Sequence, residues 1–421
     1  MAERAHIAAP SPPYLVSWNL TNRCNLKCDH CYLDAKELNG DTDITTEQAY
    51  GIIDSVAELA PGAMLILTGG EPLLRPDIFD LAMYADSLGL TPVLGTNGTL
   101  IDDTVAAQIK ASNIKGVGLS IDSVTPLFHD HFRGLDGAWT KTIGAAAALY
   151  ANGIDFQLQF TVMRENMEQI QEVIALAATT KARAINLFFL VCTGRGTERT
   201  DLTPDEYENA LNAIAVAERK YAGRIMVRAR CAPHILRIID EQEAAALSEA
   251  TSSAAGATAG CIAGTGYLRI SPDGGVTPCP YIPVEASTPN IMTENLRDIW
   301  ENGQEFQSLR NGTLGGKCKE CDWAKECGGC RARALATTGE LMGEDPLCAH
   351  EPPVKDDTHP EDRTKERDRP KWSDEATERL DAVPAFLRAM VKTGVEKYAA
   401  HRGVAIITPE VMKELKSKSG L

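Results

Sequence analysis

Seven short apolar runs alternate with helix-patterned segments over the first 230 of the chain's 421 residues. The runs occupy residues 14–20, 63–70, 91–97, 116–122, 156–162, 185–191 and 224–230. Alternation of this kind predicts parallel strands that are joined by right-handed crossover helices. Six or seven such units in about 220 residues favour a barrel over a two-layer fold, and a barrel of this kind carries its chemistry at the carboxyl ends of its strands. We therefore expect an α/β fold, a partial (β/α)6-type barrel.

The composition excludes several classes of protein. A net charge of −16 opposes binding to nucleic acid, which needs a basic surface. No apolar run reaches the roughly 18–20 residues that cross a bilayer. The N-terminal residues also lack the basic-then-apolar order of a signal peptide. The sequence thus predicts a cytoplasmic protein with no membrane partner and no nucleic-acid partner.

Three of the twelve cysteines lie within eight residues, in the segment LTNRCNLKCDHCYL at 20–33. Cysteines of a cytosolic protein seldom form disulfides, and clustered ones more often hold metal. A closed zinc site needs four ligands, whereas this segment supplies three. Three thiolates on a [4Fe-4S] cluster leave one iron open to a further ligand. From this segment alone, buried structural cysteines and part of a zinc knuckle remain alternatives.

The C-x3-C-x2-C spacing, followed by the aromatic Tyr32, resembles the signature of the radical S-adenosylmethionine (SAM) family. The resemblance implies that Cys24, Cys28 and Cys31 hold a [4Fe-4S] cluster whose open iron binds SAM. Reduction of such a cluster cleaves SAM to a 5'-deoxyadenosyl radical. Tyr32 would then lie beside the cofactor.

Three further motifs each follow one of the predicted strands: TGGEP at 68–72, TNG at 96–98 and SID at 120–122. A Gly-Gly pair lets the backbone approach a ligand closely, and an acidic group accepts a hydrogen bond from a ligand ammonium. In the radical SAM resemblance, these motifs contact SAM. The residues implied are Gly69, Gly70, Glu71, Pro72, Asn97, Ser120 and Asp122.

A second set of cysteines begins at residue 261 and resembles the SPASM extension, which carries auxiliary [4Fe-4S] clusters. The resemblance implies one cluster on Cys318, Cys321, Cys327 and Cys348, and another on Cys261, Cys279 and Cys330. One or both of these clusters are expected to be present. Three roles stay open for Cys231: the missing fourth ligand, a substrate contact, or a core residue. A cluster near the substrate suits electron transfer, which favours a net oxidation.

The chain divides by composition into six parts. They are an N-terminal tail (1–13), the radical SAM barrel (14–240), a linker (241–260), the SPASM cluster domain (261–350), a charged linker (351–370) and a small helical C-terminal domain (371–421). The last part resembles the small terminal domain of a subunit of the light-independent protochlorophyllide reductase. Its alternative is a generic helical interaction module.

The distal phrase SPDGGVTPCPYIPV…CGGCRARALATTGELMGEDPLC resembles SPASM enzymes of the sirohaem-derived haem pathway and of haem d1 assembly. The resemblance implies an enzyme that decarboxylates, or removes acetate or propionate groups from, the side chains of an iron tetrapyrrole. A ferredoxin- or flavodoxin-type reductant would serve it. The alternatives are a peptide or protein maturase and a non-catalytic cluster protein.

A carboxylated macrocycle calls for cationic anchors, since the arginine fork pairs with a carboxylate in bidentate fashion. The candidate anchors are Arg195, Arg228, Arg230, Arg331 and Arg333. The candidate ligands for a haem iron are His129, His131 and His234, although a core or surface position is the more ordinary place for each of them.

Overall fold

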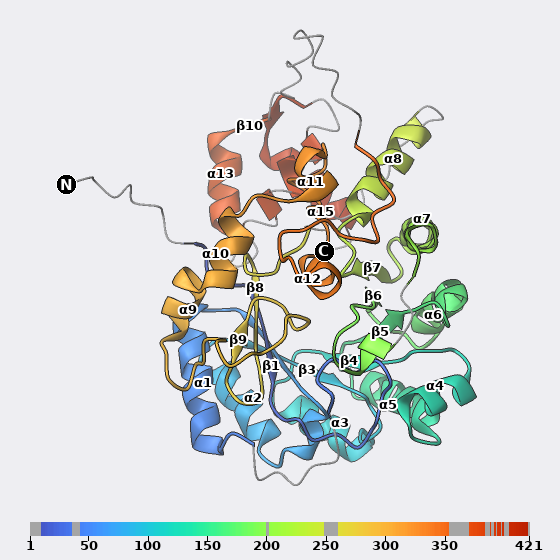
Figure 1. The fold of residues 1–421 in the computed structure, drawn as a ribbon, viewed down its shortest axis with the longest axis vertical. Helices are drawn as coiled ribbons and strands as arrows, with labels where there is room; N and C mark the ends of the chain where they lie inside the picture. The colour runs from blue at the N-terminus through green and yellow to red at the C-terminus, as the bar shows by residue number, and fades with distance from the viewer. Residues whose placement is uncertain are drawn as a thin grey trace, which may run out of the picture.

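Nine strands form one curved sheet in the computed structural model (Figure 1), in the order β7-β6-β5-β4-β3-β2-β1-β8-β9. The structure describes residues 10–35, 43–198, 202–247, 260–352, 370–383, 388, 391–392, 394–396, 398–399 and 404–419. All neighbouring strands are parallel except β8 and β9, which are antiparallel. Since β7 and β9 are the two edges, the barrel stays open, as expected.

The seven strands that the apolar runs predict are present, and only β6 begins earlier than its run, by one residue. They are β1 (Leu15–Asn19), β2 (Met64–Thr68), β3 (Thr91–Thr96), β4 (Val117–Ser120), β5 (Phe156–Val162), β6 (Ala184–Phe189) and β7 (Met226–Arg230). The other two strands of the sheet, β8 (Tyr267–Ile270) and β9 (Val276–Thr277), were not predicted.

Helices connect the parallel strands and cover the convex face of the sheet. They are α1 (Thr46–Leu59), α2 (Ile78–Ser87), α3 (Asp103–Ala111), α4 (Pro126–Arg133), α5 (Ala138–Ala151), α6 (Ile170–Thr179), α7 (Pro204–Tyr221) and α8 (Ile235–Leu247). Helices α1 and α7 each begin with a capping box, in which a threonine and the Gln or Glu three residues later satisfy each other's backbone N–H groups. Among the described residues, none of the helices is both long and apolar enough to cross a bilayer.

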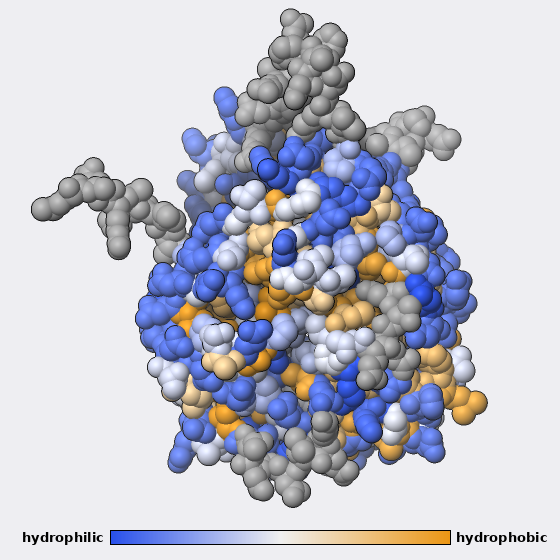
Figure 2. Space-filling model, viewed as in Figure 1, coloured by the Kyte–Doolittle hydropathy of each residue, from blue (hydrophilic) through white to orange (hydrophobic). Residues whose placement is uncertain are grey.

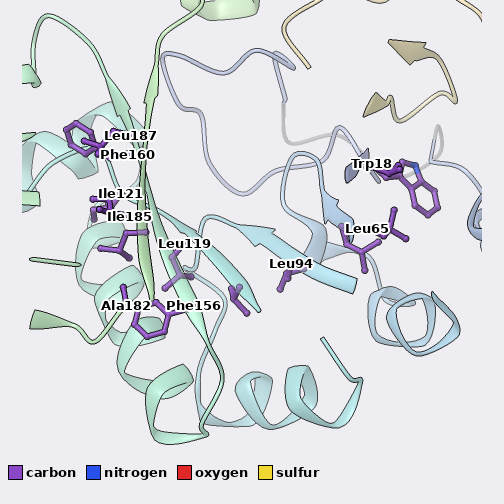
Figure 3. Close-up of a cluster of buried hydrophobic side chains, with 14 of the residues drawn as sticks. Trp18, Leu65, Leu94, Leu119, Ile121, Phe156, Phe160, Ala182, Ile185 and Leu187 are labelled. Carbon is purple, nitrogen blue, oxygen red and sulfur yellow. The ribbon is translucent and has the colours of Figure 1, made fainter. Parts of the chain in front are cut away.

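Alternation along each strand separates an apolar face from a polar one. In β5 the side chains of Phe156, Leu158 and Phe160 are buried in the core against the helices, as Figure 3 shows for the residues it labels. Gln157 and Gln159 lie between them and point to the other face, because successive side chains of a strand alternate. The face of β5 that lines the interior of the barrel is consequently polar.

The cysteine-rich segment continues the barrel sheet. Its first strand, β8, pairs in parallel with β1 from Leu15↔Tyr267 to Trp18↔Ile270. The helices that follow are α9 (Leu296–Asn302), α10 (Gln304–Asn311), α11 (Gly316–Glu320) and α12 (Arg331–Thr338). The barrel and the second segment therefore share hydrogen bonds across the boundary that the sequence predicted between them.

The C-terminal part combines helices with a two-stranded parallel sheet. It contains β10 (Lys371–Trp372), α13 (Asp374–Asp381), β11 (Ile406–Ile407) and α15 (Pro409–Ser419). A separate apolar cluster around Ala376, Val395 and Ile407 holds these elements together. The predicted helical C-terminal domain therefore also contains a short strand pair. Most of the charged linker and residues 248–259 of the first linker lie outside the described residues.

Candidate functional site: three groups of cysteines around the barrel

The first three cysteines lie on the loop that follows β1, at the carboxyl end of the strand. Cys24 and Cys28 are buried, whereas Cys31 is partly exposed. The backbone N–H of Leu26 donates to Cys24 Sγ, and that of Ala35 donates to Cys31 Sγ, each over 3.4 Å. Hydrogen bonds of this kind stabilise a thiolate, which is the form that ligates metal.

Burial raises the pKa of the Cys24 thiol to about 12, and the neighbouring charges of Cys28 and Cys31 act in the same direction. The three sulfurs therefore lie close enough to repel one another when ionised. Metal binding relieves such repulsion and releases the thiol protons. Among the described residues, no three His, Cys, Asp or Glu side chains converge closely enough to hold a single metal ion. Three thiols on one short loop are the donor set of a [4Fe-4S] cluster that keeps one iron open, so the residues present fit a cluster.

The GGEP motif packs directly against the cysteine loop. The N–H of Gly70 donates to the Thr21 carbonyl over 2.7 Å, and the N–H of Glu71 donates to the Arg23 carbonyl over 2.8 Å. A Cβ on Gly70 would lie only 2.0 Å from the carbonyl oxygen of Arg23. The glycine is thus required by close backbone approach to the residue that immediately precedes Cys24.

Glu71 is fully buried and braces two of the predicted motifs. Its carboxylate accepts hydrogen bonds from the Leu73 N–H, the Thr96 hydroxyl and the Asn97 N–H over 2.8–3.1 Å. Burial raises its pKa to about 7, although these donors act in the opposite direction. The carboxylate therefore ties the loop after β2 to the loop after β3, beside the cysteines.

Asp122, which ends the SID motif, is buried in an ion pair that the sequence did not predict. Arg133 Nε donates to it over 2.6 Å, and His30 Nε2 lies 3.9 Å away. Burial alone would raise the pKa of Asp122, but the charge and hydrogen bond of Arg133, together with the nearby His30 and His129, outweigh this and lower it. Arg133 also acts on Cys28, so the pair sets the charge behind the cysteine loop. Ser120, the last residue of β4 and two positions before Asp122, donates its hydroxyl to the Thr96 carbonyl.

Tyr32 and the remaining motif residue, Asn97, are both anchored by side-chain hydrogen bonds. The Tyr32 hydroxyl accepts from Asn19 Nδ2 over 2.9 Å. Asn97 Nδ2 donates to Asn25 Oδ1 over 2.8 Å, and Asn25 lies next to Cys24. The predicted cofactor residues after β1, β2 and β3 therefore form one connected rim around the cysteine loop.

Arg195 serves this loop as well, and not as the substrate anchor that the sequence suggested. Its side chain donates to the carbonyls of Cys28 and Ala35 over 2.8 and 2.9 Å, and pairs with Asp34. The segment after β6 thereby holds the second half of the cysteine loop, from Cys28 to Ala35. Contacts across more than 150 residues cannot be recognised from local sequence patterns.

A second group of cysteines gathers beside the barrel opening. Cys231 lies at the end of β7, and it packs with Cys279 and Cys330 in one cluster of buried side chains. Burial raises the pKa of Cys279 well above its usual value, and the charges of Cys231, Cys330 and Cys261 act in the same direction. Three predicted ligands are thus brought together, with Cys231 as the fourth member of the group.

A third group contains the other predicted auxiliary ligands. The charges of Cys348 and Cys318 act on Cys327, whose pKa burial raises to about 12. The Sγ atoms of Cys321 and Cys327 each accept a backbone N–H over 3.4 Å. The same donor arrangement occurs on the first cysteine loop.

A buried ion pair links the second group to the third, in which the Cys348 N–H donates to the Asp345 carbonyl over 3.1 Å. Asp345 is fully buried, accepts the N–H of Cys330 over 2.7 Å, and pairs with Arg333 Nη1 at 3.0 Å. Arg333 Nη2 donates to the Cys231 carbonyl over 3.0 Å. Arg331 donates to the Gly343 carbonyl over 2.6 Å. Both arginines therefore stabilise the cysteine-rich segment, contrary to the expectation that they face a substrate.

The histidine candidates are also placed. His129 is buried and its Nδ1 accepts the Asp122 N–H over 3.1 Å, whereas His131 is exposed on α4. His234 is buried, with its Nδ1 2.9 Å from the Tyr207 hydroxyl. Burial lowers the pKa of both buried histidines to about 4, so they remain neutral. These contacts support core positions for His129 and His234 and a surface position for His131.

Known proteins share both the sequence and the fold. The family model for the radical SAM superfamily matches residues 18–177, the iron-sulfur cluster-binding SPASM model matches 261–330, and the model for the proto-chlorophyllide reductase 57 kD subunit matches 372–416. An AdoMet-dependent heme synthase of Methanosarcina barkeri is 39% identical over 83% of this chain and 100% of its own length. An Fe-coproporphyrin III synthase of the same organism is 30% identical over 79% of this chain and 87% of its own length.

Among solved structures, SuiB of Streptococcus suis bound to S-adenosylmethionine has a TM-score of 0.65. It is 18% identical, and the match covers 81% of this chain and 78% of that one. The chain therefore belongs to the radical SAM superfamily and, within it, to the SPASM-domain enzymes. Membership implies a SAM-binding [4Fe-4S] cluster together with auxiliary clusters.

Proposed function

We propose that this enzyme oxidatively decarboxylates propionate side chains of an iron coproporphyrin and so forms the vinyl groups of haem. The relative at 39% identity, which matches along its whole length, is named a heme synthase. The relative named for making Fe-coproporphyrin III is 30% identical. Their order of similarity favours loss of propionate carboxyl groups over loss of acetate groups.

The observation that carries the proposal is the charge of the barrel interior. The chain as a whole has a net charge of −16, yet the strands direct Arg228, Arg230 and Arg269 into the barrel. Arg269 Nε donates to Asn19 Oδ1 over 2.6 Å, and its guanidinium lies 5.8 Å from the centre of the Tyr32 ring. A positive interior in an acidic protein suits a substrate that carries several carboxylates.

Figure 2 adds the outer surface to this picture. Pale and orange residues gather around a hollow at the centre of the face shown, near α12 and β8, and blue residues surround it. An apolar hollow with a few cationic groups is the kind of site that a large, flat, carboxylated macrocycle requires.

We assign the first cluster to Cys24, Cys28 and Cys31. When bound, this cluster supplies the electron that cleaves SAM to the deoxyadenosyl radical. The SAM site is formed by the predicted cofactor residues, which either contact SAM or hold the loops that do. They are Tyr32, Gly69, Gly70, Glu71, Pro72, Asn97, Ser120 and Asp122. Each propionate gives up a hydrogen atom, carbon dioxide and one electron, so the reaction needs an electron acceptor.

We assign the auxiliary clusters, as electron acceptors, to the second and third groups of cysteines. The third group is Cys318, Cys321, Cys327 and Cys348, and the second is Cys261, Cys279 and Cys330, with Cys231 as its fourth ligand. Cys231 has a left-handed backbone (φ 55°), which is costly for a residue with a side chain and is typical of functional positions. Four thiolates leave no iron open, so this cluster would pass electrons and not bind substrate.

Replacing Cys231 with alanine is expected to lower the iron content of the purified protein by up to about four atoms per chain, because an auxiliary [4Fe-4S] cluster loses a ligand. The spectrum of the reduced auxiliary cluster should change or vanish, while binding of SAM to the first cluster persists. Iron analysis and electron paramagnetic resonance measure both effects. An unchanged spectrum and iron content would show that Cys231 is not a ligand.

The proposed reductant is a ferredoxin- or flavodoxin-type protein, and the proposed compartment is the cytoplasm. Low-potential electrons are needed for reductive cleavage of SAM, and reduced thiols for cluster assembly. The preparation must therefore be anaerobic.

Anaerobic incubation with SAM, a strong reductant, and either iron coproporphyrin III or didecarboxysirohaem tests the function. Mass spectrometry then follows both the macrocycle and deoxyadenosine. We expect iron coproporphyrin to lose two formate equivalents and didecarboxysirohaem to remain unchanged. Loss of two acetate groups from didecarboxysirohaem would instead show that the enzyme removes acetate groups and does not decarboxylate propionates. Deoxyadenosine with no change in either macrocycle would favour a peptide substrate.

A further inference from the structure

Arg228 and Arg230 project from the same side of β7 into the barrel. Along this strand Val227 and Ala229 are buried in the core, where α7 packs against β7, and the residues between them are only partly buried. Since side chains alternate across a strand, the two arginines face the interior. They are the two candidate anchors that the cysteine loops do not use.

Neither arginine forms an ion pair with a carboxylate within the described part of the chain. Arg228 Nη2 lies 2.9 Å from the sulfur of Met226, and the charge of Glu218 reaches Arg228 only at longer range. Arg230 Nε donates to Asn186 Oδ1 over 3.0 Å. No hydrogen bond among the described residues engages the terminal nitrogens of Arg230. A buried or half-buried arginine is ordinarily paired.

Polar side chains of the two neighbouring strands fix the direction of the Arg230 guanidinium. Asn186 on β6 accepts from Arg230, and its own Nδ2 donates to Gln157 Oε1 on β5 over 2.8 Å. The three residues thus form a ladder across β5, β6 and β7. Because the bond to Asn186 uses Nε, the ladder leaves the two terminal nitrogens, a ready-made carboxylate fork, facing the interior.

The electrostatic surroundings of Arg230 favour an anionic ligand. A second guanidinium, that of Arg228, projects from the same face of β7 two residues away. Arg230 is cationic, because an arginine stays protonated in proteins, and no carboxylate of the described residues pairs with it. A bound carboxylate would supply a counter-charge and two hydrogen bonds at once.

We propose that Arg230 binds one propionate carboxylate of the tetrapyrrole through its two terminal nitrogens, with Asn186 as a positioning residue. The inference rests on the proposed function, since it takes the substrate to be a carboxylated macrocycle. It assigns to one residue the selection of carboxylated over uncharged macrocycles. The position at the end of β7, next to Cys231, places the anchored side of the macrocycle toward the second group of cysteines.

Binding without turnover tests the proposal. Iron coproporphyrin III and its tetramethyl ester, which has the same macrocycle but no charged carboxylates, are titrated anaerobically without SAM and followed by absorption. Arg230→Gln should weaken binding of the tetra-acid by about 10- to 100-fold, as expected for loss of a charged hydrogen-bonded pair. Binding of the ester should stay the same. Arg230→Lys, which keeps the charge but not the fork, should show a smaller loss for the tetra-acid.

Arg183→Gln serves as the matched control, because Arg183 is exposed and its nearest carboxylate, Asp155, is 3.8 Å away. It should bind both macrocycles as the wild-type protein does. Equal losses of the two macrocycles in Arg230→Gln would assign Arg230 a structural role, and unchanged binding of the tetra-acid would exclude it as an anchor. Wild-type protein that binds neither macrocycle would reject the proposed function, and the anchor with it.

Discussion

Replacing Cys28 with alanine is expected to abolish the cleavage of SAM and to remove about four iron atoms per chain, the content of one [4Fe-4S] cluster. Two thiolates remain on the loop after this change. Cys28 is the central one of the three and the most closely surrounded: Arg195 donates to its carbonyl, and the charges of Arg133 and Asp122 reach its sulfur. Deoxyadenosine formation with a strong chemical reductant, together with iron analysis, measures both losses.

The control is Cys192→Ala, since Cys192 lies in a small apolar cluster with Phe132, Met163 and Leu190 and not with either auxiliary group. Its iron content and its deoxyadenosine formation should match those of the wild-type protein. If Cys28→Ala still cleaved SAM at the wild-type rate, the assignment of the first cluster to this loop would be wrong.

Replacing Gly70 with alanine is expected to lower iron content and SAM cleavage almost as much as Cys28→Ala, although no cluster ligand is removed. The new Cβ would lie 2.0 Å from the Arg23 carbonyl oxygen, a backbone atom that cannot move unless the cysteine loop moves with it. Overpacking of this kind costs about 1–3 kcal/mol or more. The displaced loop should lose most of the first cluster, as iron content and the SAM-dependent spectrum will show.

Gly51→Ala is the matched control for this change. Gly51 lies within α1, and a Cβ there would meet nothing within 4 Å. Alanine should therefore be neutral or should stabilise the protein by about 0.5–1 kcal/mol, because glycine is a poor helix residue. Full iron content in Gly70→Ala would contradict the close packing between the GGEP motif and the cysteine loop.

The strands β1 to β7 and the cysteine groups were predictable because their signals are local. Alternation of apolar residues places β5 at 156–162, and spacing alone separates the first cysteine loop from the later ones. The partners that hold the groups in place were not predictable. Arg133 pairs with Asp122 and acts on Cys28 from a helix whose sequence reads as an ordinary amphipathic segment.

Long-range pairing explains the other differences between the sequence prediction and the structure. β8 is a four-residue run that joins the sheet beside β1, some 250 residues earlier in the chain, so its register cannot be deduced from the local sequence. The sequence predicts Arg195, Arg331 and Arg333 as carboxylate anchors on the same grounds as Arg230. Only their contacts show that the first three hold loops, whereas Arg230 bonds to Asn186 on the neighbouring strand and to no cysteine loop.

The most direct test of the proposed function follows one hydrogen atom. Iron coproporphyrin III that carries deuterium on the propionate carbons next to the ring is incubated anaerobically with the enzyme, SAM and reductant. We predict that deuterium appears in deoxyadenosine as the vinyl product forms. Deoxyadenosine free of deuterium, or a macrocycle that keeps all its carboxyl groups, would contradict the account.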